Sequence, residues 1–143
     1  MKNEEIEEVM QAHLGYTDEE ARLFMENPRN ADVLSKVEAM MNNTIIFEVV
    51  ESHGCASQHK VGDKIYFDGA GNLIASMGPK RICCFALESV TKLIFGAQEL
   101  FYAGVDPNEL RFKRTSCFDV GLKCGGWGQI AMEIKVEGRG KRS

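Results

Sequence analysis

The residues of this sequence best suited to chemistry are its cysteines and one histidine, His59. The five cysteines are Cys55, Cys83, Cys84, Cys117 and Cys124. All five lie at the ends of predicted elements or in predicted loops, where functional groups concentrate. Cysteines that only fill space are more often scattered within elements as small apolar side chains. The placement therefore indicates one thiol-rich functional site.

Cys55 and His59 are close enough in the sequence to share a metal ion, and Cys83 and Cys117 could complete a tetrahedral set of four ligands. Soft thiolates with an imidazole favour zinc or iron over magnesium. The spacing is not that of a zinc ribbon, because no Cys-x-x-Cys pair is present. We expect a metal site formed by Cys55, His59, Cys83 and Cys117. Three protein ligands would leave a position for water or substrate, whereas four would make the site structural.

Two other uses of the cysteines stay open. Cys83 lies near the start of a predicted helix, where the partial positive charge of the helix end lowers a thiol pKa. His59 could then accept the thiol proton, giving a nucleophilic pair. Alternatively, the thiols are buried packing groups. A complete set of disulfides is excluded, because the number of cysteines is odd.

Four further residues are candidates for a supporting or ligand-binding role. Asp63 and Asp119 could orient an imidazole, an arrangement that recurs around metals, although Asp63 could equally be the acid of a Val-Gly-Asp turn. Cys124 and Trp127 belong to a glycine-rich loop that continues to Gly128. This loop could let a ligand approach the backbone, with Trp127 as an apolar wall, or it could be a bulged turn into the last strand.

The elements that must position these residues form a predicted α+β core over residues 44–137. Residues 44–52 and 64–68 are predicted strands, and residues 130–136 alternate apolar and polar side chains, as expected of a strand with one buried face. A long helix is predicted after Pro79. We expect a small, mostly antiparallel sheet with one long helix. Residues 138–143 form a short basic tail.

Residues 1–43 form a predicted acidic segment of three helices. This segment carries four basic and ten acidic side chains, a net charge of −6, and residues 44–143 carry thirteen and eleven, a net charge of +2. None of the three helices can bury its apolar stripe alone. We therefore expect them to pack on each other, on the core, on a second copy of the chain in a homo-oligomer, or on a partner subunit.

Composition narrows the class of protein. The 143 residues suffice for one domain with an appendage, and 44% hydrophobic with 27% charged residues is globular composition. No apolar run approaches the roughly 20 residues that cross a bilayer. A net charge of −4 argues against nucleic-acid binding. The acidic N-terminus is not a secretory signal, so we expect a cytoplasmic protein. Its partner would be a small molecule, and we expect it to bind neither nucleic acid nor a membrane.

The motifs around the cysteines resemble those of a family of small uncharacterised prokaryotic proteins. The resemblance rests on Gly54-Cys55 followed by His59-Lys60-Val61-Gly62-Asp63, on Ile82-Cys83 with Ala86-Leu87, and on Cys117 with Asp119. It covers roughly residues 45–136. The chain has Gln58, Cys84 and Phe118 where Gly, Pro and Pro are usual in that family. The resemblance implies that Cys55, His59, Cys83 and Cys117 form one polar set, and it implies no reaction.

These observations predict a small protein with one Cys/His site that binds zinc or iron and acts as an enzyme or accessory subunit on a small molecule. One alternative is a non-catalytic binding or assembly module with structural cysteines. A further alternative is a thiol redox protein. No sequence motif indicates which reaction the protein catalyses or which substrate it binds.

Overall fold

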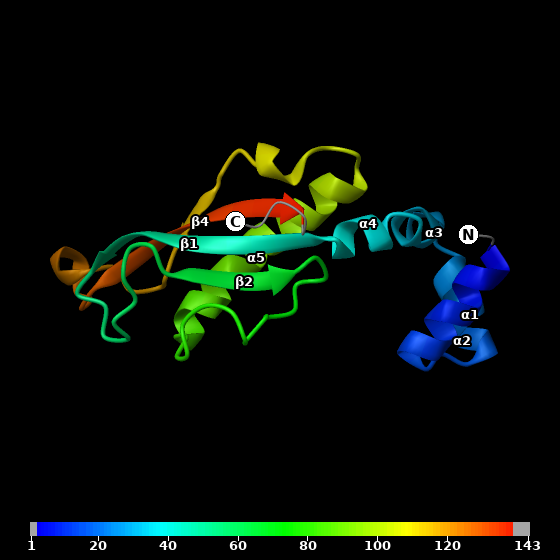
Figure 1. Cartoon of the computed structure of the whole chain (residues 1–143), viewed down its shortest axis with the longest axis horizontal. Helices are drawn as coiled ribbons and strands as arrows, with labels where there is room; N and C mark the ends of the chain where they lie inside the picture. The colour runs from blue at the N-terminus through cyan, green and yellow to red at the C-terminus, as the bar shows by residue number, and fades with distance from the viewer. Residues whose placement is uncertain (1–2, 139–143) are drawn as a thin grey trace. The chain divides into compact units, whose positions relative to one another are not determined.

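The structure is a computed structural model that describes residues 3–138 of the chain. The chain divides into two compact units, and the boundary along the sequence falls between Ala39 and Met40. The first contains short helices only: α1 (Asn3–Leu14), α2 (Asp18–Met25), α3 (Pro28–Leu34) and the start of α4 (Val37–Met41). The second contains β1 (Asn43–His53), β2 (Lys64–Asp68), α5 (Cys84–Tyr102), β3 (Arg114–Ser116) and β4 (Gln129–Gly138), with short 3₁₀ turns at Pro107–Glu109 and Leu122–Cys124. The predicted α+β class is confirmed (Figure 1).

The start of α2 is closed by a capping box, for which Thr17 and Glu20 have the required spacing in the sequence. The Thr17 hydroxyl accepts a hydrogen bond from the backbone N–H of Glu20 at 3.2 Å, and the Glu20 carboxylate accepts one from the backbone N–H of Thr17 at 2.8 Å. Two backbone donors that a helix end leaves unpaired are thereby satisfied.

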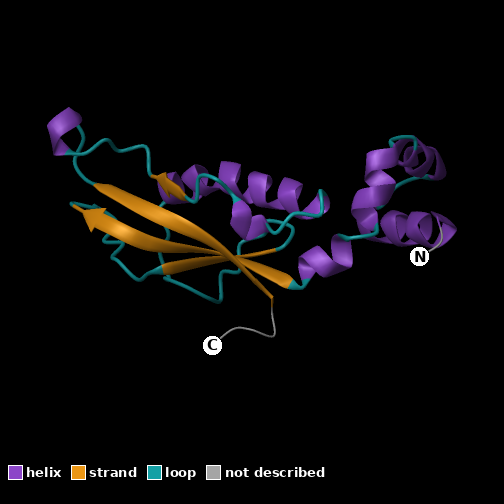
Figure 2. Ribbon diagram, turned by 90° about the horizontal axis from the view of Figure 1, so that it is seen from above, coloured by secondary structure: helices purple, strands orange, loops and turns teal. Residues whose placement is uncertain are grey.

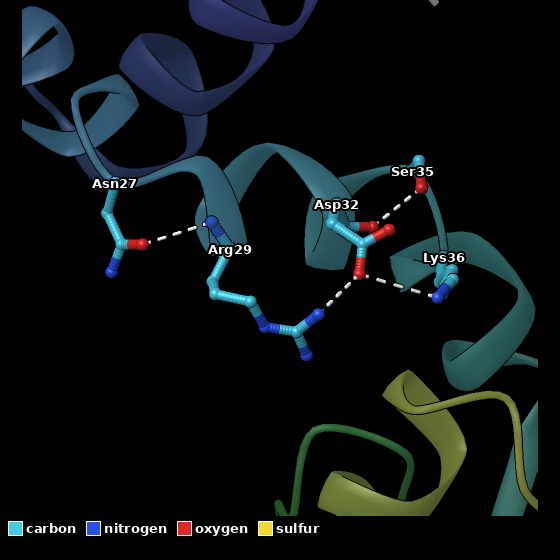
Figure 3. A network of polar contacts seen from close by, with 5 residues as sticks. All are labelled: Asn27, Arg29, Asp32, Ser35 and Lys36. Carbon is cyan, nitrogen blue, oxygen red and sulfur yellow. Dashed lines mark hydrogen bonds and ion pairs between the residues drawn. The ribbon is translucent and has the colours of Figure 1, made fainter.

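The third of the helices expected in residues 1–43 is instead two short helices, α3 and α4. At the interruption the backbone N–H of Lys36 donates to the carbonyl of Val33, a tighter turn than that of an α-helix, and the Ser35 hydroxyl donates to the carbonyl of Asp32 at 2.6 Å. The Asp32 carboxylate also holds Arg29 at 2.8 Å and Lys36 at 3.4 Å (Figure 3). Because these ion pairs are exposed, each contributes at most about 0.5 kcal/mol. The ion pairs of Asp32 hold the turn between α3 and α4 in place but add little to the stability of the unit.

The sheet has four antiparallel strands in the order β2-β1-β4-β3. The central strand β1 places Phe47 opposite Ile65 of β2 on one side and opposite Ile134 of β4 on the other. The predicted antiparallel closing strand is confirmed. The strand β3 was not predicted, because three residues are too few to show an alternating pattern.

Helix α5 packs on one face of the sheet (Figure 2). The core between them is apolar, with Phe47, Met132 and Ala97 fully buried. The same cluster contains Ile45, Val49, Ile65, Phe67, Ala86, Val90, Leu93, Ile94, Ile130, Ile134 and Val136. Cys55, Cys83 and Cys117 pack against its edge and are half-buried. The core therefore anchors the three cysteines without enclosing them.

The opposite face of the sheet is charged. Cross-strand ion pairs join Lys64 to Glu48 at 3.6 Å and Arg114 to Glu133 at 2.9 Å. One face is thus apolar and covered by a helix and the other is polar, the usual arrangement of an antiparallel sheet in a two-layer protein. No helix among residues 3–138 has the length and apolar character needed to span a membrane.

Two glycines let the backbones of β1 and β4 come together at the end of the sheet. A Cβ at Gly128 would overlap the carbonyl group of Gly54 and lie 2.5 Å from the carbonyl oxygen of His53. Gly54 has a φ of +68°, in the left-handed region that glycine adopts without strain. This approach brings the loop after β1, which carries Cys55, against the start of β4.

Candidate functional site

Three of the five cysteines line one pocket of about 220 Å³. Cys55 comes from the loop after β1, Cys83 from the amino end of α5, and Cys117 from the residue that follows β3. The other residues that line it are Ala56, Ser57, Phe85, Phe118, Asp119, Gly128, Gln129 and Ile130. We call this space the three-cysteine pocket. Three stretches that are distant in the sequence meet here because β1 and β4 pair in the sheet and α5 packs across them.

Cys83 is the N-cap residue of α5, a helix of 19 residues. Burial raises the pKa of its thiol, but the backbone N–H groups of Ala86 and Phe85 and the hydroxyl of Ser57 stabilise the thiolate more strongly, so that the pKa of Cys83 lies below its ordinary value. The positive end of the helix macrodipole acts in the same direction. The setting of Cys83 therefore favours the thiolate form of its side chain.

His59 is buried and holds the backbone at Cys83. Its Nε2 atom accepts a hydrogen bond from the backbone N–H of Cys83 at 3.1 Å. The acceptor nitrogen is thus engaged by the main chain rather than by the sulfur. Because an N-cap residue has its own N–H outside the helical ladder, the imidazole satisfies a donor that would otherwise be unpaired. His59 therefore lies beside Cys83 and there positions the start of α5.

Cys117 and Cys55 are fixed by the backbone. The N–H of Cys117 donates to the carbonyl of Ile130 at 3.2 Å, and the N–H of Ile130 lies 3.5 Å from the Cys117 sulfur. The carbonyl of Cys55 accepts from the N–H of Gln58 at 3.0 Å, which closes a turn. Gln58 has a φ of +59°. No other non-glycine residue among residues 3–138 has a positive φ. The backbone at Gln58 thus adopts the conformation that glycine prefers.

Asp119 organises the loop between β3 and β4. Its carboxylate accepts hydrogen bonds from the backbone N–H groups of Gly121 at 2.9 Å, Trp127 at 3.0 Å and Gly128 at 3.1 Å. The N–H groups of Gly121 and Gly128, and to a smaller extent that of Trp127, lower the pKa of Asp119. The glycine-rich segment is therefore a turn tied to Asp119 that leads into β4. Of the two interpretations of this loop, the structure favours the turn.

Replacing Asp119 by asparagine is expected to remove a pH-dependent contribution to stability. Because the folded-state pKa of Asp119 is depressed, its carboxylate stabilises the fold fully above the unfolded value of about 3.9, and this stabilisation is lost as the pH falls through the lower folded value. Urea unfolding of both proteins at several pH values measures it. The difference between wild type and Asp119→Asn should be largest near neutrality and shrink below about pH 4. A difference that stays constant with pH would contradict this role.

Three of the predicted supporting residues lie outside the pocket lining. The Asp63 carboxylate accepts from the backbone N–H of Lys60 at 3.0 Å and so belongs to the Val-Gly-Asp turn. Cys124 is exposed in the turn at Leu122–Cys124. Trp127 is 77% exposed and lines a separate shallow space with Phe118 and Val120. Asp119 is the predicted supporting residue that lines the three-cysteine pocket.

The metal-ligand set that the sequence predicts is only partly assembled. Within residues 3–138, no three or more His, Cys, Asp or Glu side chains are arranged to hold a metal ion. Cys55, Cys83 and Cys117 share the pocket, while the Nε2 atom of His59 is bonded to the main chain. A metal ion at this pocket would require the sulfurs to move together.

Sequence reasoning missed the aromatic side of the pocket. The rings of Phe85 and Phe118 lie 4.7 Å apart at a tilt of 44°, and both side chains are largely exposed. Phe85 is the second residue of α5 and Phe118 follows Cys117 directly. The available signal was the position of each phenylalanine next to a cysteine at an element end. An exposed aromatic pair at such a place is more typical of a binding surface than of a core.

No protein-family model matches this chain, and no curated protein or solved structure shows a significant similarity to it. The resemblance of its cysteine motifs to those of small prokaryotic proteins stays a prediction, and the function must be argued from the pocket itself.

Proposed function

We propose that this protein acts on a small molecule through the thiolate of Cys83, which forms a covalent bond with an electrophilic ligand held in the three-cysteine pocket. The observation that carries the proposal is the setting of Cys83, an N-cap thiol that lines a pocket and has a lowered pKa. Such a setting is typical of reactive cysteines, which lie partly exposed in electropositive surroundings. Inert packing cysteines are buried instead.

The rest of the pocket supports this role. Ser57 provides a hydroxyl that stabilises the thiolate, and the Cys83 side chain is only half-buried, so a ligand can reach it. His59 is a positioning residue, because it fixes the backbone of Cys83 without touching a ligand. Cys55 and Cys117 are the second and third thiols of the site and lie where a bound ligand would contact them.

The test is the pH dependence of alkylation at Cys83 in the folded chain. The rate with iodoacetamide, followed by mass spectrometry of the peptide that contains Cys83, is measured between about pH 5 and about pH 10. We expect half of the maximal rate at a pH below about 8.5, the ordinary value for a cysteine thiol. A midpoint at or above that value would contradict the proposal. Cys84→Ser is the matched control, since Cys84 is adjacent and exposed but does not line the pocket.

The second candidate function is binding of a thiophilic metal ion, zinc or iron, by Cys55, Cys83 and Cys117. The specific observation in its favour is that three cysteines line the same small pocket. Anaerobic purification followed by titration with Zn²⁺ tests it. One equivalent bound, lost in Cys55→Ser and Cys117→Ser but kept in Cys124→Ser, would support it. Less than a tenth of an equivalent would exclude it, and the thiolate proposal would be unaffected.

A further inference from the structure

The lining of the three-cysteine pocket carries one charged side chain besides its thiols. Apart from the cysteines, Asp119 is the ionisable side chain that lines it, and its carboxylate is held in the ionised form by backbone N–H groups. No Lys, Arg or His is among the described residues that line the pocket. The N–H groups at the start of α5 are directed at the sulfur itself. Besides the thiolate, the charged side chain that a ligand meets is therefore the Asp119 carboxylate, and no side chain of the lining offers a cationic partner for an anion.

The walls and the size of the pocket add a second restriction. Ala56, Ile130 and the Phe85–Phe118 pair present apolar surface to a space of about 220 Å³. For scale, a cavity of about 150 Å³ holds one benzene molecule. A ligand not much larger than a substituted ring fits this volume. A carboxylate or phosphate placed there would lose part of its hydration against the apolar walls and would find no cationic side chain in the lining, which is unfavourable.

We infer that the pocket takes small, uncharged, largely apolar electrophiles and rejects those that carry a carboxylate or a phosphate. This inference rests on the proposed function, because it names the substrate class of the Cys83 thiolate. The thiolate attacks the electrophilic carbon, a sulfur–carbon bond forms, and the leaving group departs with its bonding electron pair. No proton acceptor is consumed, since the sulfur is already deprotonated.

A pair of reagents that differ in charge but hardly in size tests the inference. Iodoacetamide and iodoacetate both alkylate thiolates with loss of iodide, and only iodoacetate is an anion. The second-order rate of each reagent at Cys83 is measured in the folded full-length chain and again in urea, where the pocket is absent. The quantity compared is the ratio of the iodoacetamide rate to the iodoacetate rate. We expect this ratio to be about tenfold higher in the folded chain, because the repulsion acts at short range.

Gln129 offers a matched pair of variants, since it lines the pocket and is exposed. Gln129→Lys adds a cation to the lining, and we expect it to raise the iodoacetate rate and to lower the ratio toward the value in urea. Gln129→Glu adds an anion and is expected to raise the ratio further. Opposite shifts in two variants of similar size separate an effect of charge from an effect of packing.

The outcomes distinguish the inference from the proposed function. If Cys83 reacts faster with iodoacetamide in the folded chain than in urea, but the ratio is the same in both, the thiolate proposal stands and the charge selection is wrong. If Cys83 reacts no faster in the folded chain with either reagent, both are wrong. A raised ratio that Gln129→Lys lowers and Gln129→Glu raises supports both.

Discussion

Alanine in place of Gly128 is expected to lower the free energy of unfolding by about 3 kcal/mol or more. The added Cβ would overlap the carbonyl group of Gly54, which is backbone and cannot rotate away. Relief therefore requires the end of β1 to separate from the start of β4. Since Cys55 follows Gly54 directly and Gln129 and Ile130 follow Gly128, the same movement opens the three-cysteine pocket.

Urea unfolding measures this loss, and Gly138→Ala is the matched control. Gly138 lies at the other end of the same strand, and an added Cβ there meets no atom within 4 Å. We expect Gly138→Ala to remain within about 0.5 kcal/mol of the wild type, as a surface substitution normally does. Equal stabilities for the two variants would show that the two backbones are not in contact at Gly54 and Gly128.

Replacing His59 by alanine is expected to cost about 2–4 kcal/mol and to raise the pKa of Cys83. The stability falls because a buried ring is removed and because the backbone N–H of Cys83 loses its acceptor. The pKa rises because the N–H groups of Phe85 and Ala86 stabilise the thiolate only while the start of α5 keeps its position. Unfolding curves and the pH profile of alkylation measure the two effects on one preparation.

Two further variants separate the hydrogen bond at His59 from the packing of its ring. His59→Gln keeps a side-chain acceptor, and we expect it to restore part of the lowered pKa of Cys83. His53→Ala removes an exposed histidine at the end of β1 and should leave both measurements unchanged. If His59→Ala destabilises the protein but leaves the pKa of Cys83 where it was, His59 is a core residue and not a positioning residue.

Local sequence signals predicted much of the fold correctly. The alternation of Ile130, Met132, Ile134 and Val136 with polar residues identified β4, because a half-buried strand leaves that pattern in any tertiary context. The Thr17–Glu20 capping box was equally local. The break between α3 and α4 was not predicted, because the apolar pattern of the sequence continues through it. The chain turns there through the hydrogen bond from the Ser35 hydroxyl to the carbonyl of Asp32.

The sequence predicted part of the composition of the candidate site but not its geometry. The position of Cys55, Cys83 and Cys117 at element ends marked them as candidates, and all three line one pocket. The bond from the Cys83 N–H to His59 spans residues far apart in the sequence, so no local spacing reveals it. The amides that hold Asp119 lie two to nine residues away in the same loop, but they follow no spacing that the sequence makes visible. Long-range strand pairing and helix docking decide such contacts, and a single sequence does not encode them as a visible pattern.

The protonation of the Cys83 sulfur can be observed without any reagent. In a chain labelled with ¹³C at the cysteine Cβ atoms, the resonance of Cys83, assigned by its loss in Cys83→Ser, reports the change from thiol to thiolate as the pH is raised. We predict a single transition of the Cys83 resonance with its midpoint below about pH 8.5. In His59→Ala we expect this midpoint to lie at a higher pH. A midpoint at or above about 8.5 in the wild type, unmoved by the loss of His59, would contradict it.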